Sequence, residues 1–311
     1  MISPMALGRM KNRVVIVKRI QSILLLVLAS SVFGESINSS SGGLNFAYAW
    51  IINGTYFYRG QTEGSVDLHF RWAPGVSAVR LLDPSIGVVI TDSYLNVIDN
   101  KTFVVTRIGN YKKVTNVFVG SKPGLFYFID DKSLLQHSVE SNSDQIVQSL
   151  SPLVELLNTW YQRNSKDEFF KPFEAYFVAI DELTNTLYFS DPNWNLFSYN
   201  LKTQDLKYLT IGRSPQVVLE QGKGSSVYFT QDKGIGYFYT TTPSVIKPLF
   251  AGDIASFKIH GHELFTVSLG RHDNLKGVGS VGGFSVVSNG VVQEVETKIV
   301  PSDILLIQRG K

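Results

Sequence analysis

One short pattern recurs along this sequence, an apolar run of β-forming residues that ends in a small or polar residue. It reads LYFSD at residues 187–191 and returns as VVITD, FYFID, VYFTQ and LFTVS. The copies end at Asp92, Asp130, Asp191, Gln231 and Ser268, which are separated by 38, 61, 40 and 37 positions. A period near 40 residues is typical of a β-propeller, in which each repeat is one four-stranded sheet, or blade.

Each copy has companions that complete such a sheet. An apolar run precedes it, as in AYFVAID, and a hairpin follows it, as in LFSYNLKTQDLKYL. Clusters of Asn, Gly, Asp and Ser bound these runs and mark the turns between strands. Five complete four-stranded units are therefore predicted.

The two ends of the chain supply the parts of a sixth unit. Residues 49–60 (AWIINGTYFYRG) form a hairpin pattern without preceding inner strands, and residues 299–308 (IVPSDILLIQ) form an inner-strand pattern without a hairpin. Joining them leaves no open sheet edge. We predict an all-β, six-bladed propeller over residues 35–311, with blade 1 closed by N- and C-terminal strands. Five or seven blades, and two stacked β-sandwiches, remain as alternatives.

The long interval of 61 residues predicts an insertion between two blades. Residues 151–170 (SPLVELLNTWYQRNSKDEFF) begin with Ser151 as an N-cap and Pro152 at the first helical position. Leu153, Leu157 and Trp160 recur at helical spacing. A helical insertion is therefore expected at residues 151–170.

Residues 1–34 have the three parts of a secretory signal peptide: a basic leader, the apolar stretch IQSILLLVL and a run of small residues. An uncleaved membrane anchor is the alternative, but the apolar stretch is short for a bilayer. We expect a secreted protein without a membrane segment after cleavage. Removing residues 1–34 removes five positive charges, so the net charge changes from +3 for the whole chain to −2 for residues 35–311. No basic patch remains to suggest a nucleic-acid partner.

One further feature fits an extracellular chain, and the cysteine count adds a constraint on the fold. The sequons at Asn38, Asn53 and Asn100 predict N-glycosylation. The chain has no cysteine, so it has neither disulfides nor thiol chemistry, and packing alone must stabilise the fold.

Three of the recurring strands end in an acidic residue, at Asp92, Asp130 and Asp191. A short side chain that accepts hydrogen bonds suits a turn after a strand, and turn formation is the first interpretation. Equivalent positions on different blades face a common axis, so a ligand or metal contact is the second.

The stretch FVAIDELTNTLYFSDPNWNLFSYNL (177–201) resembles the YWTD blade of low-density-lipoprotein-receptor propellers, with Phe189 and Ser190 where that motif has Trp and Thr. LYFSDP is also similar to a stretch of gluconolactonase-like and strictosidine-synthase-like propellers. Both resemblances imply a six-bladed ring. The YWTD resemblance implies an extracellular protein-interaction propeller.

A narrower resemblance is to insect ommochrome-binding proteins, which are secreted carriers of about this length. The order WIINGTYFYRG, SVDLHF and LLDPSIGVVITD near the start is similar to theirs, as is FKIHGHELFTV before GGFSVVSNGVVQEVE near the end. This resemblance implies a carrier of a pigment or tryptophan metabolite. The lack of cysteine is a departure from that family.

A catalytic site is harder to derive from these residues. Lactonase-type propellers hold calcium with oxygen ligands, and the three strand-end aspartates are of that type, but the expected Asn-Gly and Asp-Gly pattern on inner strands is missing. His260 and His262 could begin a zinc site, yet the sequence supplies no further ligand. We expect no enzyme, no cofactor and no metal, with a calcium-dependent lactonase-like hydrolase as an alternative.

A binding role requires fewer specialised residues. The candidate ligand-binding residues lie at predicted strand ends and comprise Arg71, Trp72, Asp92, Asp130, Asp191, Trp194 and Arg271. Aromatic rings stack on a planar ligand while arginine or aspartate holds its polar edge. The competing interpretation is that Trp72 and Trp194 pack between blades. The prediction is a secreted, monomeric, non-enzymatic propeller that binds a small aromatic ligand in its central channel, with an extracellular protein as the alternative partner.

Overall fold

The fold is described here from a computed structural model. It describes residues 46–52, 55–59, 64–67, 76–82, 86–99, 102, 104–120, 124–164, 177–220, 224–232, 234–251, 254–260, 263–268, 282–288, 291–297 and 303–309. The predicted signal peptide and the three sequons lie outside these residues.

The described strands pair into six antiparallel four-stranded sheets. The first three are β24-β1-β2-β3, β4-β5-β6-β7 and β11-β10-β9-β8. Their strands are β1 (Phe46–Ile52), β2 (Thr55–Arg59), β3 (Gly64–Asp67), β4 (Val76–Leu81), β5 (Ile86–Thr91), β6 (Leu95–Asp99), β7 (Val105–Ile108), β8 (Val114–Val119), β9 (Leu125–Asp130), β10 (Ser133–Ser138), β11 (Ser143–Ser149) and β24 (Asp303–Arg309).

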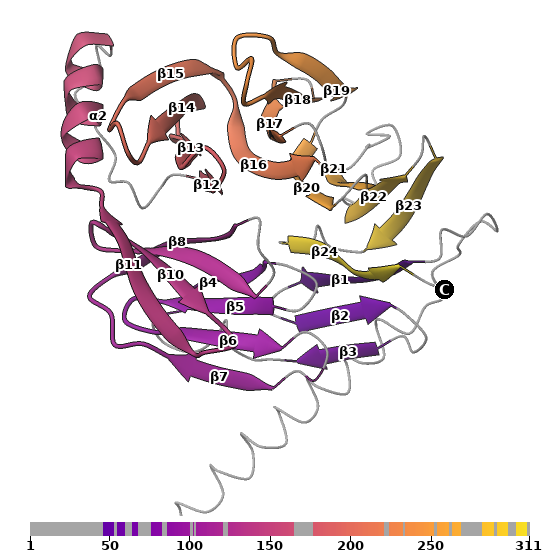
Figure 1. The fold of residues 1–311 in the computed structure, drawn as a ribbon. Helices are drawn as coiled ribbons and strands as arrows, with labels where there is room; N and C mark the ends of the chain where they lie inside the picture. The colour runs from indigo at the N-terminus through magenta and orange to yellow at the C-terminus, as the bar shows by residue number, and fades with distance from the viewer. Residues whose placement is uncertain are drawn as a thin grey trace, which may run out of the picture. The chain divides into compact units, whose positions relative to one another are not determined.

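The other three sheets follow the chain order, as β12-β13-β14-β15, β16-β17-β18-β19 and β20-β21-β22-β23. Their strands are β12 (Phe177–Asp181), β13 (Thr186–Ser190), β14 (Asn195–Asn200), β15 (Leu206–Ile211), β16 (Arg213–Glu220), β17 (Gly224–Gln231), β18 (Gly234–Tyr239), β19 (Lys247–Ala251), β20 (Ile254–His260), β21 (Glu263–Ser268), β22 (Gly282–Ser288) and β23 (Val291–Thr297). Figure 1 shows their arrangement.

The chain is an all-β propeller with one described helix, which confirms the predicted fold class at that level. Burial explains why the repeated apolar runs are continuous rather than alternating. Every residue of β5 and β13 is buried, because apolar neighbours cover both faces of these second strands. The outermost strands β7 and β11 are mostly exposed. In these blades the second strand is therefore largely buried and the fourth strand faces solvent.

Strand pairing gives six sheets, but side chains are described for only part of the predicted six-bladed ring. Side chains are described for four successive blades, which begin with β4, β8, β12 and β16, although those of β4 itself are not among them. In the sheets that begin with β20 and β24 the description is almost entirely of the backbone. The six-bladed ring is therefore taken up as a proposal below.

The core lies in apolar layers between consecutive blades. Ile129 and Leu134 of one blade pack with Phe189 and Phe197 of the next in a single buried cluster. A second cluster joins Tyr188 to Phe229 across the following interface. Burying a side chain of this size contributes on the order of 2 kcal/mol, so the layers between blades are the main source of stability.

Polar side chains also tie neighbouring blades together. The Gln216 amide on β16 donates to the carbonyl of Phe257 on β20 and accepts from the Ile259 N–H at 3.1 Å. Ser225 donates to the buried carboxylate of Asp181 at 2.8 Å. Where main-chain pairing between sheets is absent, these side-chain bonds fix the relative positions of the strands that they join.

The predicted insertion contains helix α2 (Ser151–Asn164), which lies beside β15 in Figure 1. Leu153, Leu157 and Tyr161 form its buried face. Trp160 is partly buried and stacks on Tyr208 of β15 with ring centroids 5.7 Å apart. The helix prediction is thus confirmed over residues 151–164, and residues 165–170 lie outside the description. No helix within the described ranges is long and apolar enough to cross a bilayer.

Candidate functional site

The strand registers define corresponding ends for the blades. In the strand registers the first residue of each inner strand pairs at or next to the last residue of the second strand, as in Phe177 with Ser190 and Val114 with Asp130. The turns that follow the second strands therefore lie at the end of the blades where the inner strands begin. We call this the entry end of the blades.

The best-defined feature at the entry end is the turn Asp191–Trp194 between β13 and β14. Asp191 is completely buried. Its Oδ1 accepts from the Asn195 N–H and its Oδ2 from the Asn195 amide, both at 2.7 Å, and the Tyr161 hydroxyl of α2 also donates to Oδ2. The helical insertion thus reaches into this turn, and both oxygens of Asp191 are already occupied.

The same turn holds Trp194 in an unusual backbone conformation. Its φ is +68°, in the left-handed region that favours glycine. Trp194 N–H donates to the Asp191 carbonyl at 3.1 Å, and Gly212 N–H donates to the Trp194 carbonyl at 2.7 Å. The backbone is therefore fixed by hydrogen bonds on both sides, and the partly exposed indole is presented from a rigid loop.

Gly212 lies where the turn meets the start of the next blade. A Cβ at this position would come 2.3 Å from the Phe229 ring, so only glycine allows this close approach. The next residue but one, Ser214, also has a positive φ, +54°, and its N–H donates to Ser190 Oγ at 3.2 Å. A β-bulge at the start of β16 accompanies these bonds and aims Arg213.

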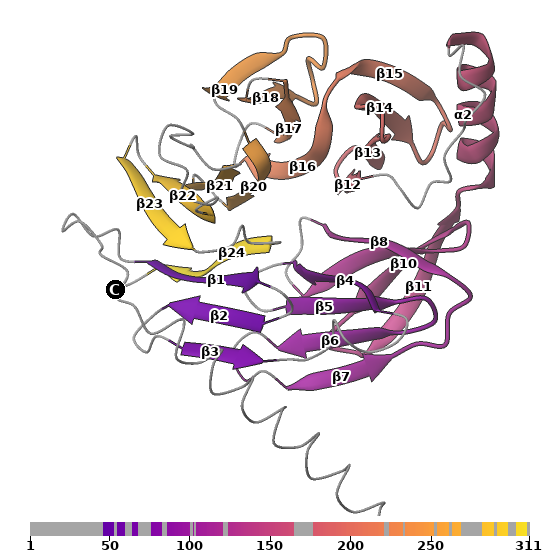
Figure 2. The ribbon, with the colours of Figure 1, turned by 180° about the vertical axis from the view of Figure 1, so that it is seen from behind.

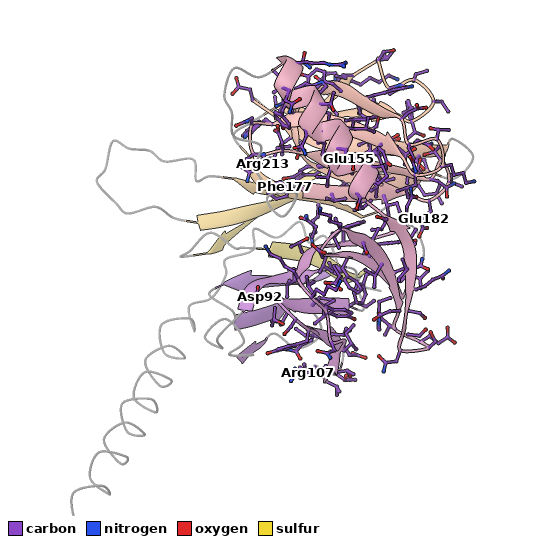
Figure 3. The ribbon with its side chains drawn as sticks, turned by 90° about the vertical axis from the view of Figure 1, so that its left-hand side faces the viewer. Asp92, Arg107, Glu155, Phe177, Glu182 and Arg213 are labelled. Carbon is purple, nitrogen blue, oxygen red and sulfur yellow. The ribbon has the colours of Figure 1, made fainter. Side chains whose placement is uncertain are left out.

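Arg213 is the cation of the site. Its Cζ lies 4.6 Å from the centroid of the Phe177 ring and 6.0 Å from that of Trp194. Figure 3 shows Arg213 and Phe177 beside each other at one end of the sheets, with Glu182 at the other. In the described part of the chain no carboxylate pairs with Arg213, and its Nε is buried without a hydrogen-bond acceptor. Aromatic faces are thus the main partners of this charge.

The two remaining strand-end aspartates differ in their contacts. Asp130 Oδ1 accepts from the N–H groups of Lys112 and Lys113 at 2.9 and 2.7 Å, which ties the β7–β8 connection to the end of β9. Asp92 is exposed, and its carbonyl accepts from Val114 N–H at 2.9 Å. The local contacts of Asp191 agree with the turn interpretation, whereas Asp130 holds a neighbouring connection. A ligand role for the three aspartates stays a prediction.

The structure brings Asp191 and Trp194 together in one turn, and it places Asp92 and Asp130 on other blades at the entry end. Arg71, Trp72 and Arg271 lie outside the described residues, as does the His262 ring. Among the residues described, no three His, Asp or Glu side chains gather into a group that could hold a metal ion. Asp191 would have to give up its bonds to Tyr161 and Asn195 to coordinate calcium.

Sequence reasoning missed Arg213, Phe177 and Tyr161. Aligning the units on their inner strands would have revealed Arg213. The inner strands of the five complete units begin with Val76, Val114, Phe177, Arg213 and Ile254, of which four are apolar. The Tyr161 contact carries no comparable signal, because it joins positions 30 residues apart that belong to different elements.

Solved structures of other proteins share the fold of this chain, although no family model and no curated protein matches it. TolB from Acinetobacter baumannii is 10% identical with a TM-score of 0.54, over 87% of this chain and 68% of TolB. A protein of unknown function from Bacteroides caccae is 9% identical with a TM-score of 0.54, over 84% and 99% of the two chains. Identities this low show the fold alone. The resemblances to YWTD, gluconolactonase-like and ommochrome-binding proteins remain expectations from the sequence.

Proposed function

We propose that this chain is a secreted, six-bladed β-propeller that acts by binding, and that it contacts a partner protein at the entry end through Trp194 and Arg213. The basic, apolar and small-residue segments of residues 1–34 support secretion. The protein-interaction role was the alternative interpretation of the sequence, and the contacts at the entry end now favour it.

Strand pairing supports the sixfold ring. β24 pairs antiparallel with β1, so strands from the two ends of the described chain share one sheet, as both views of the ribbon show (Figures 1 and 2). Contacts between neighbouring sheets run from β24 to β4, from β5 to β8, and on through β12, β16 and β20 back to β24. This sequence of neighbours is cyclic, as a closed propeller requires.

The observation that carries the binding role is the conformation of Trp194. A bulky residue in the left-handed region costs on the order of 1 kcal/mol relative to a glycine at the same φ. The turn nevertheless places an indole there, partly exposed and beside a guanidinium. Tryptophan and arginine are the side chains that most often dominate binding energy at protein interfaces. Contact with a partner would explain why this backbone conformation is kept under a partly exposed aromatic ring.

The test separates binding from folding. Glycine suits the φ of Trp194, so Trp194→Gly should keep the free energy of unfolding within about 1 kcal/mol of the wild type. The variant and the wild type are compared for retention of proteins from the fluid into which the chain is secreted. Arg107→Gln is the matched control, because Arg107 is an exposed arginine stacked 3.8 Å from the Tyr94 ring on another blade.

We expect the same protein to be retained by the wild type and by Arg107→Gln and to be lost with Trp194→Gly. Adding that protein should slow amide hydrogen exchange at residues 191–195 and 212–214. Equal retention by all three proteins, or protection confined to other blades, would contradict a partner site at the entry end.

A small aromatic ligand is the second candidate, and the Phe177–Arg213–Trp194 cluster favours it. Two ring faces around one cation provide both a stacking surface and a charge for a planar acid. Arg71, Trp72 and Arg271 belong to this hypothesis as additional lining residues. A mass spectrum of small molecules that co-purify with the secreted protein tests it, since a stoichiometric aromatic compound would support this candidate over a protein partner.

A further inference from the structure

We propose that the group recognised at the entry end is a carboxylate carried by an aromatic or apolar body, with Arg213 as its cation and Trp194 as its stacking surface. The inference rests on the proposed binding function and names the chemistry of what is bound. It applies equally to a free aromatic acid and to the C-terminal carboxylate of a peptide.

The first argument is charge. A half-buried guanidinium normally has an acidic or hydrogen-bonding partner, because removing it from water without one is unfavourable. Arg213 has aromatic faces instead, and in the described part of the chain its Nε–H has no acceptor. The acid of the same turn, Asp191, is committed to Tyr161 and Asn195. Since Nε itself is buried, an incoming anion would pair with the terminal nitrogens of this partly exposed side chain and balance its charge.

The second argument is geometry. A guanidinium stacked on a ring keeps its edge free, and its N–H donors lie in that edge as a planar fork. A carboxylate matches the fork with two parallel hydrogen bonds. Arg213 Cζ lies over the Phe177 ring, 4.6 Å from its centroid, and 6.0 Å from the centroid of the Trp194 ring, and Trp194 is partly exposed. The indole is therefore placed to stack on the body that carries the carboxylate.

The third argument is rigidity. Thr230 donates to the carbonyl of Arg213 at 3.0 Å, Gly212 bonds to Trp194, and Ser214 bonds to Ser190. Arg213 and Trp194 are thus held by adjoining parts of one hydrogen-bonded backbone network. A fixed pair loses little conformational freedom on binding, which favours affinity for a small anionic group.

The experiment compares N-acetyl-tryptophan with N-acetyl-tryptophan amide, which share an aromatic body and differ in the carboxylate. The full chain is labelled with 5-fluorotryptophan, and the Trp194 fluorine signal is assigned from its loss in Trp194→Phe. We expect the acid to shift the Trp194 signal with an affinity at least about tenfold higher than the amide, the scale of a hydrogen bond between charged groups.

Variants identify the residue responsible. Arg213→Gln should abolish the preference for the acid, whereas Arg213→Lys should retain part of it because the charge remains without the fork. Arg107→Gln should behave as the wild type. A cooperative thermal unfolding transition shows that a variant is folded. If Arg213→Gln does not fold, Arg213→Lys still tests whether the preference for the acid depends on the guanidinium.

Comparing the acid with a short peptide ending in tryptophan, as free acid and as amide, distinguishes the two sources of the carboxylate. Tighter binding of the peptide acid assigns a protein C-terminus, and tighter binding of N-acetyl-tryptophan assigns a small acid. Equal shifts by acid and amide would contradict recognition of a carboxylate by Arg213, while binding at the entry end would still stand. A Trp194 signal that moves with none of these probes would also overturn it, and the retention experiment would then judge the proposed function alone.

Discussion

The buried side chain of Asp191 connects three parts of the fold. Its carboxylate joins a helix, a turn and the first residue of a strand through bonds from Tyr161 and Asn195, and it is completely buried. Asp191→Ala leaves these donors without an acceptor, so we expect the free energy of unfolding to fall by roughly 3 kcal/mol. Urea unfolding measures this loss.

The control is Asp92→Ala, at the corresponding position of another blade. Asp92 is exposed, and a surface substitution of this kind should change stability by no more than about 0.5 kcal/mol. Equal losses for the two variants would mean that the Tyr161 and Asn195 contacts do not stabilise the fold.

Sequence reasoning reached some of these residues for reasons that are physical. A short acceptor after an apolar strand indicated the turn contacts of Asp191, since such turns are built from local hydrogen bonds. Trp194 was a candidate because it lies in the turn after that strand, and its binding role stays a prediction. Arg213 was missed although an alignment of the inner strands singles it out, whereas its contact with Phe177 depends on how two blades meet, and no local pattern encodes that distance.

At the scale of elements, α2 is a helix whose two faces have different roles. Leu157 is completely buried against the β12–β15 blade, while its neighbour Leu156 is 38% exposed. We expect Leu157→Ala to lower the free energy of unfolding by roughly 3 kcal/mol and Leu156→Ala by less than about 1 kcal/mol. Thermal unfolding of the pair checks this, and similar losses for both would show that the helix is not docked as described.

The elements themselves were largely predictable. Fixed spacing of LYFSD-like runs predicted four-stranded units, and Pro152 with leucines at helical spacing predicted α2, because both signals are periodic in sequence. The links between blades were not predictable. The Gln216 amide bonds to residues 41 and 43 positions away, and an isolated glutamine in a strand gives no sign of that.

At the scale of the whole molecule, buried tyrosines make stability depend on alkaline pH. Burial, followed by the hydrogen bond to Glu182, raises the pKa of Tyr127. Burial, followed by the charges of Asp181 and Glu220 respectively, raises the pKa of Tyr188 and Tyr228. The folded chain keeps these phenols neutral, while the unfolded chain ionises them above a pH of about 10.

Since the unfolded state then binds fewer protons than the folded state, stability is retained below that pH and falls as the pH rises through it. We expect the melting temperature to decrease steadily above a pH of about 10, with tyrosinate absorbance appearing together with unfolding. Tyr228→Phe should reduce the slope, whereas Tyr208→Phe, at an exposed position, should leave it unchanged. Tyrosinate absorbance well before unfolding would contradict this account.

The β1–β24 pair makes a prediction for the intact fold. A chain that stops before Asp303 lacks β24, so β1 loses its partner and the first sheet keeps three strands. We expect this truncation to abolish cooperative unfolding in scanning calorimetry, whereas removal of Gly310 and Lys311 alone should leave the transition unchanged. An unaltered transition in the longer truncation would rule out the six-bladed ring.

The pairing of β1 with β24 also determines when the first sheet can be completed during biosynthesis. Of the described strands, β1 is synthesised first and β24 last, so the edge of β1 stays without its partner for on the order of ten to fifty seconds of translation. During that interval the unpaired edge of β1 is open to β-pairing with a neighbouring nascent chain. Its protection falls to the chaperones of the compartment in which the chain matures.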